Sequence, residues 1–324
     1  MGKSIAVSQD LENIITDIAE VARILWKLGW AESNAGNISV NVTEYIPEDI
    51  RELNKFPSGE IDKNYPELSG FSFFITGAGT TMRGLAKEPS ENACILRIAE
   101  KSNRYHILWG KKSGLDFEPT SEIHSHLSIH SFLLGKKAPQ KVIIHAHPEE
   151  LIALTHVKEY KQESKLNRLF WSMNPAAKII IRKGVGLVPY RVPGSDELAQ
   201  ATIKAIEKHD VVLWEKHGCL AIGADVLETF DRVDILNKAA RTFFTCKSAG
   251  FDTEEVLIIE GLGESLIYQR GSVTTDYEGN IYITDLEDYS IKKFSNTGEL
   301  IAVTGKRGDE PGEFQGPNII RYYR

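Results

Sequence analysis

Strand-like and helix-like segments alternate along most of the chain. Apolar residues that run continuously or recur at every second position are typical of β-strands, whereas apolar residues spaced by three and four are typical of amphipathic helices. The strand-like segments include residues 105–110, 141–148, 178–190 and 210–223, and the helix-like segments include residues 11–30, 126–137, 195–209 and 225–250. This order predicts an α/β domain that ends near residue 253.

The pattern changes after about Gly263. From there the sequence contains short strand-like runs separated by turns, such as residues 278–280 and 296–298, and it has no helical period. We therefore expect three parts: an α/β domain of residues 1–253, a linker of residues 254–270 and an all-β tail of residues 271–324.

Composition excludes several classes of protein. The 38 basic and 45 acidic residues give a net charge of −7, and they form no basic cluster, so no nucleic-acid partner is expected. No stretch approaches the roughly 20 apolar residues of a membrane span, and the N-terminus lacks an apolar signal core. Three widely spaced cysteines are expected to be reduced thiols in a cytoplasmic protein.

Three short polar segments are candidates for binding an anion. Residues 34–37 (NAGN) and 76–79 (TGAG) place glycine beside a predicted strand, where backbone N–H groups can be open to an anion. Residues 119–122 (PTSE) precede a predicted helix, whose N-terminus also favours an anion. Each segment has a simpler interpretation, as a turn or as a helix cap.

Histidines provide the main chemical signal. His145 and His147 are two residues apart in a predicted strand, so both side chains project from one face and can bind one metal ion. The alternative is a strand with two histidines and nothing bound. His126 and His130 are four apart in a predicted helix and could also chelate, although helix packing or a supporting hydrogen bond is the simpler explanation.

His217 adds a third imidazole. It lies at the end of the apolar run VVLWEKHG, and the following glycine permits close approach of another segment or a ligand. Three neutral imidazoles with one open position suit a catalytic zinc ion. Glu122 is a candidate metal ligand or base, or simply an acidic residue in the first turn of a helix.

Seven motifs occur in an order that resembles the class II aldolase family between about residues 10 and 253. They are GWAESNAGNISV, FFITGAGTTMR, RYHILWG, PTSE, IHAHP, GVGLVPYRVPGSDELAQATI and LWEKHG. The resemblance implies an α/β/α domain with a largely antiparallel central sheet and helices on both sides. It also implies a homotetramer with sites at the subunit interfaces.

The resemblance is greatest to the branch that cleaves L-rhamnulose 1-phosphate into dihydroxyacetone phosphate and L-lactaldehyde. It implies that His145, His147 and His217 hold zinc, which chelates the substrate and stabilises the enediolate. Glu122 matches the glutamate that moves the proton at the dihydroxyacetone carbon. The residues that match substrate-binding and phosphate-binding loops are Asn34, Gly36, Asn37, Thr76, Gly77, Thr120 and Ser121.

Two positions depart from the family pattern. Ala78 replaces a serine of the second loop, and Ala176 stands near the place of a glutamate that assists protonation on the aldehyde side. Cleavage is therefore expected to be slow, to use a water, or to act on a somewhat different substrate. The alternatives are another class II sugar-phosphate aldolase or epimerase, or a catalytically impaired scaffold like the adducin relatives.

The tail also resembles a known unit. Residues 271–317 follow the pattern of one NHL-type propeller blade, with a glycine turn, a strand containing Asp, a basic-aromatic strand and a glycine-rich return. Propellers close with about four to eight blades, so one blade does not make a propeller. We expect that the tail is not needed for the chemistry of the first domain.

Overall fold

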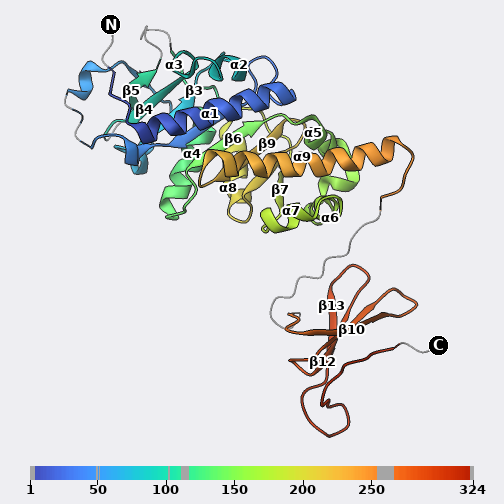
Figure 1. Ribbon diagram of the computed structural model, residues 1–324. Helices are drawn as coiled ribbons and strands as arrows, with labels where there is room; N and C mark the ends of the chain where they lie inside the picture. The colour runs from blue at the N-terminus through green and yellow to red at the C-terminus, as the bar shows by residue number, and fades with distance from the viewer. Residues whose placement is uncertain are drawn as a thin grey trace. The chain divides into compact units, whose positions relative to one another are not determined.

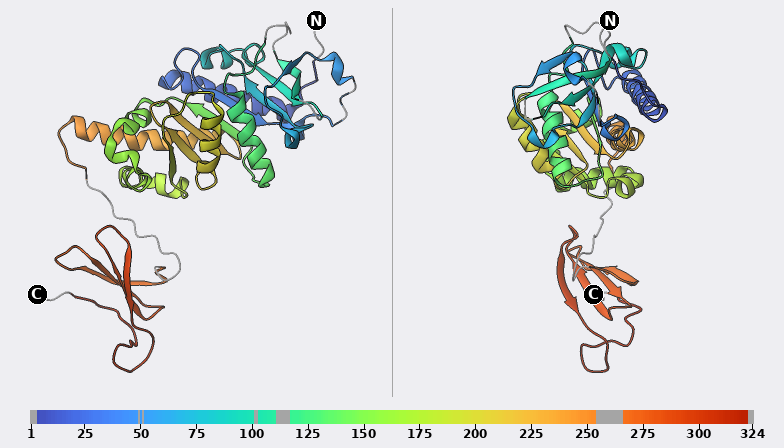
Figure 2. Two further views of the ribbon diagram at one scale, coloured as in Figure 1. Left: turned by 180° about the vertical axis from the view of Figure 1, so that it is seen from behind. Right: turned by 90° about the vertical axis from the view of Figure 1, so that its left-hand side faces the viewer.

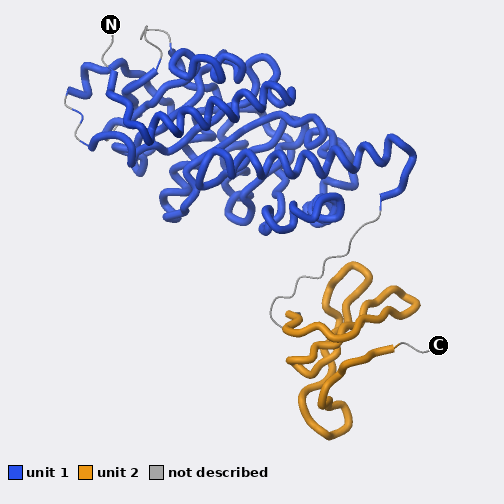
Figure 3. Tube along the Cα trace, viewed as in Figure 1, with its two compact units in different colours: residues 1–253 blue, residues 254–324 orange. Residues whose placement is uncertain are grey.

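The computed structural model describes residues 4–48, 50, 52–100, 103–110, 117–253 and 266–321. The chain divides into two compact units, residues 1–253 and 254–324 (Figure 3). Most of the predicted linker, residues 254–265, lies outside the described residues. The two units are treated separately below.

A nine-stranded sheet forms the centre of the first unit (Figure 1), with the order β2-β5-β4-β3-β1-β6-β9-β8-β7. Every neighbouring pair is antiparallel except β7 and β8, which are parallel. The strands are β1 (Asn37–Asn41), β2 (Ser58–Glu60), β3 (Ser72–Thr76), β4 (Ala93–Ile98), β5 (Arg104–Gly110), β6 (Val142–Ala146), β7 (Val185–Val188), β8 (Val211–Trp214) and β9 (Gly218–Gly223). The predicted largely antiparallel sheet is confirmed.

Helices cover both faces of this sheet (Figure 2). One face packs against α4 (Ile123–Gly135) and α8 (Asp196–Ile206), and the other against a layer that includes α1 (Gln9–Leu28) and α9 (Val226–Ser248). The remaining helices are α2 (Met82–Leu85), α3 (Pro89–Asn92), α5 (Glu149–His156), α6 (Glu163–Met173) and α7 (Pro175–Ile180), with 3-10 turns η1 (Thr43–Tyr45), η2 (Leu53–Lys55), η3 (Pro66–Leu68) and η4 (Lys158–Lys161). The α/β/α arrangement expected from the motifs is therefore present.

Local chemistry explains where α1 begins and ends. The side chain of Ser8 accepts a hydrogen bond from the backbone N–H of Leu11, which caps the first turn. Gly29 follows the last turn with φ of 77°, a left-handed conformation that glycine adopts without strain. The helix therefore begins at Gln9 and ends before Gly29, where the sequence had placed its end.

Successive side chains of β1 point to opposite faces of the sheet and therefore reach different layers of the core. Ile38 and Val40 face the layer that contains α1 and α9. Asn37 and Ser39, at the intervening positions, project to the opposite face, where α4 packs. Polar side chains of β1 are thus buried beneath α4, and they form part of the site described below.

Two expectations from the sequence were wrong in detail. Residues 178–180 belong to α7 rather than to a strand, because Asn174 caps a helix that begins with Pro175. The run of residues 210–223 is not one strand but two antiparallel strands, β8 and β9, with a turn at Lys216, where φ is 63°. His217 therefore lies in a turn.

The second unit is a four-stranded antiparallel sheet. Its strands, in spatial order, are β10 (Arg270–Thr275), β11 (Ile281–Asp285), β12 (Ser290–Phe294) and β13 (Leu300–Thr304). Lys292 Nζ lies 3.1 Å from Asp285 Oδ2, and both side chains are buried. The resemblance to one propeller blade stays a prediction.

Among the described residues, no helix is both long enough and apolar enough to cross a bilayer. The cysteines are Cys94, Cys219 and Cys246, and none forms a disulfide. Cys94 and Cys219 are buried in the sheet, and burial raises the pKa of Cys219 to about 12. These two thiols therefore stay protonated at neutral pH.

Candidate metal centre

The ends of several neighbouring strands meet at one edge of the sheet. β6 ends at Ala146, β8 ends at Trp214 and β9 begins at Gly218, so the histidines that flank them come together. The register between β1 and β6 pairs Asn37 with His145 across this edge. Antiparallel pairing therefore gathers residues that are more than 100 positions apart in sequence.

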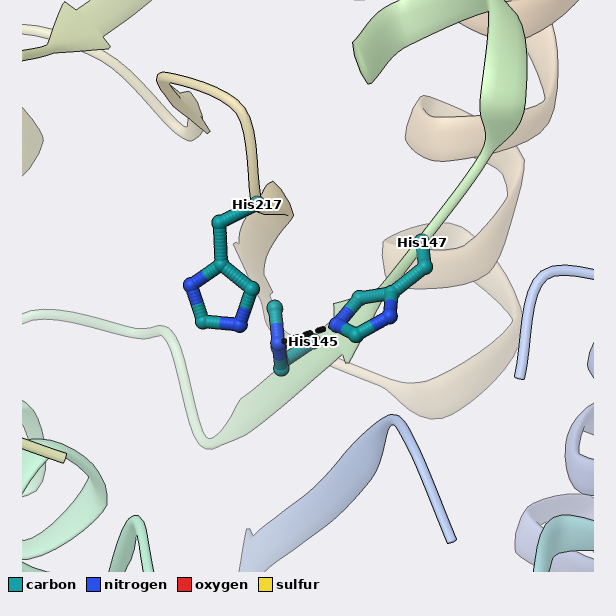
Figure 4. Close-up of side chains that lie close together, drawn as sticks. All are labelled: His145, His147 and His217. Atoms are coloured by element: carbon teal, nitrogen blue, oxygen red, sulfur yellow. Dashed lines mark hydrogen bonds between the residues drawn. The ribbon is translucent and has the colours of Figure 1, made fainter. Parts of the chain in front are cut away.

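His145, His147 and His217 form a compact cluster (Figure 4). Ring centroids are 4.8 Å apart for His145 and His147, 4.8 Å for His145 and His217, and 5.1 Å for His147 and His217. One ring nitrogen from each residue lies within 4.8 Å of the others, so all three could bind one metal ion.

Hydrogen bonds fix which nitrogen of two of these rings faces the centre of the cluster. His145 Nδ1 lies 2.8 Å from the carbonyl oxygen of Cys219, and His147 Nδ1 lies 3.1 Å from Glu32 Oε1. Both acceptors hold the proton on Nδ1 and leave a lone pair on Nε2, as metal-binding histidines require. The two Nε2 atoms are 3.1 Å apart, a distance at which a shared cation would relieve the repulsion between lone pairs.

Burial keeps two of these imidazoles, those of His145 and His217, neutral. Desolvation, helped by nearby His147, lowers the pKa of His145 to about 3. Desolvation and His145 together lower the pKa of His217 to about 4. Neutral imidazole is the form that ligates a metal, so the donor set fits a zinc ion with one position left for another ligand.

Gly218 is required by the close packing of this centre. A Cβ atom built on Gly218 would lie 2.5 Å from the carbonyl oxygen of Ala146, 2.8 Å from His147 Cδ2 and 3.1 Å from His145 Cε1. The sequence had suggested that this glycine permits a close approach, and the approaching segment is the end of β6. A larger residue would displace two candidate ligands.

Trp214 supports two of the rings, a contact that the sequence did not reveal. Its ring centroid lies 4.5 Å from that of His145 and 5.1 Å from that of His217. The indole Nε1–H donates to Thr202 Oγ1 at 2.9 Å, which fixes the plane of the indole. Trp214 is buried and forms one wall of the histidine cluster.

Glu122 lies beside the cluster, at the N-cap position of α4. Its Oε2 is 3.7 Å from His145 Nε2, and its Oε1 is 3.8 Å from His217 Nε2. Asn37 Nδ2 donates to Oε2 at 2.8 Å, and the backbone N–H of Glu122 donates to Thr120 Oγ1 at 3.3 Å. A buried carboxylate thus borders the space in front of the histidines.

His126 and His130 belong to a different set of contacts. His126 Nδ1 lies 2.6 Å from Ser39 Oγ, and His130 Nε2 lies 2.9 Å from the same oxygen. The remaining nitrogen of His126 contacts Asn37 Oδ1. The structure therefore favours the supporting-hydrogen-bond interpretation over chelation by this pair, and Ser39 is a participant that the sequence gave no reason to select.

The predicted substrate loops surround the same edge, but their backbone amides are less open than expected. Gly77 N–H donates to the carbonyl oxygen of Asn92 at 3.0 Å, and Ala78 N–H donates to that of Glu118 at 2.8 Å. The expected cradle of free amides is therefore wrong for these two groups. Thr76 Oγ1 is also engaged, as the acceptor of the backbone N–H of Ile38 at 3.3 Å.

The other predicted substrate residues differ in exposure. Asn34 and Ser121 are exposed, and Thr120 is buried. Gly36 has φ of 76°, and a Cβ there would lie 3.1 Å from the carbonyl oxygen of His145, so the first loop packs against the end of β6. Ala176 lies in the first turn of α7 and has no ionisable group to offer.

Comparison with known proteins identifies the family. Residues 16–244 match the model of the class II aldolase and adducin N-terminal domain. This match covers more than half of the chain, and the chain belongs to this family. The resemblance expected from the motifs is thereby confirmed.

Two curated relatives are similar over most of their length, and both are named rhamnulose-1-phosphate aldolase. The protein from Bacteroides thetaiotaomicron is 42% identical over 243 residues, which cover 74% of this chain and 88% of that protein. The protein from Listeria welshimeri is 32% identical over 232 residues, which cover 70% and 81%. Both alignments cover about three quarters of this chain or slightly less.

A solved structure shares the fold. It is described as a sugar-phosphate aldolase from Thermotoga maritima, with 33% sequence identity and a TM-score of 0.65. The alignment covers 75% of this chain and 98% of that structure. The nine-stranded unit therefore corresponds to the whole of this relative.

Proposed function

We propose that the chain catalyses zinc-dependent retro-aldol cleavage of L-rhamnulose 1-phosphate into dihydroxyacetone phosphate and L-lactaldehyde. The observation that carries the proposal is the cluster of three imidazoles with the Glu122 carboxylate 3.7 to 3.8 Å from two of them. The names of the curated relatives support this choice of substrate.

His145, His147 and His217 would hold one zinc ion per chain. A zinc ion at this position would supply a Lewis acid for the carbonyl and hydroxyl oxygens of a ketose phosphate. The protein supplies the orientation, because Cys219, Glu32 and Trp214 fix the imidazole rings.

Glu122 would move the proton at the dihydroxyacetone carbon. Cleavage removes a proton from the hydroxyl group that becomes the aldehyde and adds one to the dihydroxyacetone carbon, which keeps the electron pair of the broken bond. A carboxylate next to the histidine cluster would take up a proton and deliver it to that carbon. The hydrogen bond from Asn37 Nδ2 leaves Glu122 Oε1 without a restraint from that amide. One oxygen is thus held, and the other would be available to a bound substrate.

The remaining predicted site residues are proposed to bind the substrate oxygens and the phosphate. They are Asn34, Gly36, Asn37, Thr76, Gly77, Thr120 and Ser121. Because the amides of Gly77 and Ala78 already donate within the protein, a phosphate bound there depends on side-chain donors or on a rearranged loop. The exposed side chains of Asn34 and Ser121 are open to such a ligand.

Ala176 sets an expectation for the rate. A missing general acid typically lowers the rate by about 10²- to 10⁴-fold unless water or another group takes its place. We therefore propose slow cleavage of L-rhamnulose 1-phosphate, with related ketose 1-phosphates as alternative substrates.

A homotetramer is also proposed. Size-exclusion chromatography with light scattering measures the number of subunits.

The test is a coupled assay for dihydroxyacetone phosphate, with zinc content measured on the same sample. His145→Ala should lose zinc and cleavage together, because it removes a candidate ligand. Glu122→Gln should keep zinc and lose cleavage, because it removes only the proton carrier. Glu122→Gln with an unchanged rate would overturn the role of Glu122, and zinc retained by His145→Ala would overturn the ligand assignment.

A further inference from the structure

A continuous chain of hydrogen bonds links His130, in the middle of α4, to Glu122. It runs from His130 Nε2 to Ser39 Oγ at 2.9 Å, and from Ser39 Oγ to His126 Nδ1 at 2.6 Å. His126 Nε2 then contacts Asn37 Oδ1, and Asn37 Nδ2 contacts Glu122 Oε2 at 2.8 Å. All five side chains are buried, and Ser39, His126 and His130 are each 1% exposed or less.

The orientation of the Asn37 amide fixes the direction of every bond in this set. Asn37 donates from its Nδ2 to Glu122 Oε2 and directs its Oδ1 toward His126. Because an amide oxygen only accepts, His126 Nε2 must carry the ring proton, and its Nδ1 must accept from the hydroxyl of Ser39. Ser39 Oγ is then free to accept from His130 Nε2–H.

The two histidines are in the protonation state that this direction requires. Burial lowers the pKa of His126 to about 4 and the pKa of His130 to about 3, so each ring carries one proton at neutral pH. A neutral ring with its proton on Nε2 donates from one nitrogen and accepts at the other. The Phe73 ring, 4.7 Å from His130, packs against the far end of the chain of bonds.

We propose that His130, Ser39 and His126 act as positioning residues that lock the Asn37 amide with Nδ2 toward Glu122. The locked amide holds the carboxylate beside the histidine cluster, ready for proton transfer. Reversing the amide would place Asn37 Oδ1 against the carboxylate, which is repulsive, and would require a new proton arrangement at every member of the chain of bonds. This inference rests on the proposed role of Glu122 as proton carrier.

The inference gives Asn37 a role beyond the predicted substrate binding. Both ends of its amide are already engaged inside the protein, so its first task is to orient Glu122. It also explains why two histidines are buried on α4 outside the histidine cluster. Their spacing of four residues brings both rings onto one oxygen, that of Ser39.

The test isolates proton transfer from carbon–carbon bond cleavage. Zinc-loaded protein is incubated with dihydroxyacetone phosphate in deuterium oxide, and exchange of its carbon-bound hydrogen is followed by NMR. His126→Leu cannot donate to Asn37. This variant should keep its zinc and its KM for dihydroxyacetone phosphate but should slow exchange by about 10²-fold, since small displacements of a reacting group have effects of this size. His126→Gln, whose amide can replace the ring N–H, should retain most of the rate.

His124→Leu is the matched control, because His124 lies on the same helix and outside this chain of bonds. It should leave zinc content and exchange unchanged. Unchanged exchange in His126→Leu, or equal losses in the Leu and Gln variants, would overturn the proposal.

Nitrogen-15 NMR of the histidine rings is a second test that does not depend on activity or on folding of a variant. The unsubstituted protein should show His126 and His130 with the proton on Nε2 at neutral pH. A proton on Nδ1 of either ring would reverse the direction and refute the proposal. If the unsubstituted protein exchanged no hydrogen, the proposed function would fail, and the ring tautomers would still decide whether this chain of bonds exists.

Discussion

The ring nitrogen Nδ1 of His145 lies 2.8 Å from the main-chain carbonyl oxygen of Cys219. A carbonyl oxygen can only accept a hydrogen bond, so this contact keeps the proton on Nδ1 and the lone pair on Nε2. The same register pairs His145 with Leu220 across β6 and β9, so the β-ladder itself sets the tautomer. The central strands therefore prepare the ligand before any metal binds.

Glu32 is expected to strengthen metal binding through His147. Its carboxylate lies 3.1 Å from His147 Nδ1, and loss of such a partner typically lowers metal affinity by about 10- to 100-fold. Glu32→Ala should therefore bind zinc more weakly in competition with a chelator of known affinity. Glu32→Gln, which keeps an acceptor, should lose less, and Glu20→Ala on α1 should lose nothing. Equal affinity of Glu32→Ala and the unsubstituted chain would exclude this role.

Gly218→Ala is expected to damage the metal centre. The new Cβ would press on the Ala146 carbonyl and on two candidate ligands, and overpacking of this kind costs about 1 to 3 kcal/mol. We expect lower zinc occupancy and a lower Tm. Gly135→Ala, at a position with open space around the new Cβ, is the control and should preserve both. Full zinc occupancy in Gly218→Ala would show that the two strands can move apart without consequence.

Acid is expected to destabilise the metal-free protein partly through His130. Burial lowers its pKa in the folded state to about 3, whereas an unfolded histidine titrates near 6.5, so the unfolded state binds more protons below pH 6.5. The contribution is about 1.4 kcal/mol of unfolding free energy lost per pH unit between about pH 6.5 and 3.

Urea unfolding at several pH values measures this effect. His130→Gln, which keeps a donor for Ser39 but cannot gain a proton, should show a shallower loss of stability in this pH range than the unsubstituted chain. Identical slopes for the two proteins would mean that His130 takes up its proton in the folded state.

Removal of the second unit is expected to leave the metal centre intact. All residues of the candidate site lie between Glu32 and His217, within the first compact unit. A chain that ends at Thr253 should therefore keep its zinc content and its rate of dihydroxyacetone phosphate release. Loss of zinc or of activity on truncation would assign the second unit a part in the site.

Local sequence patterns predicted most helices and strands of the first unit because interactions between residues close in sequence determine these elements. The helix α1 follows from its apolar spacing, from Ser8 and from Gly29. The three isoleucines at 179–181 suggested a strand through their β-branched side chains, but the cap at Asn174 and Pro175 starts a helix there. The turn at Lys216 was missed because no glycine or asparagine occupies the position with positive φ.

The candidate ligands could be selected from the sequence, but their partners could not. His145 and His147 share a strand pattern, whereas Glu32, Ser39 and Trp214 contact the site through pairings between distant segments. Ser39 meets His126 only because β1 lies beneath α4, a relationship between residues 87 positions apart. No local sequence pattern indicates such a contact, so the structure was needed to find the supporting hydrogen bonds.

The most direct test of the account is to remove and restore the metal while measuring cleavage of L-rhamnulose 1-phosphate. A chelator should abolish release of dihydroxyacetone phosphate, and added zinc should restore it in proportion to occupancy, up to one ion per chain. Cleavage that persists in metal-free protein, or zinc-saturated protein that releases no dihydroxyacetone phosphate, would contradict a zinc aldolase built on His145, His147 and His217.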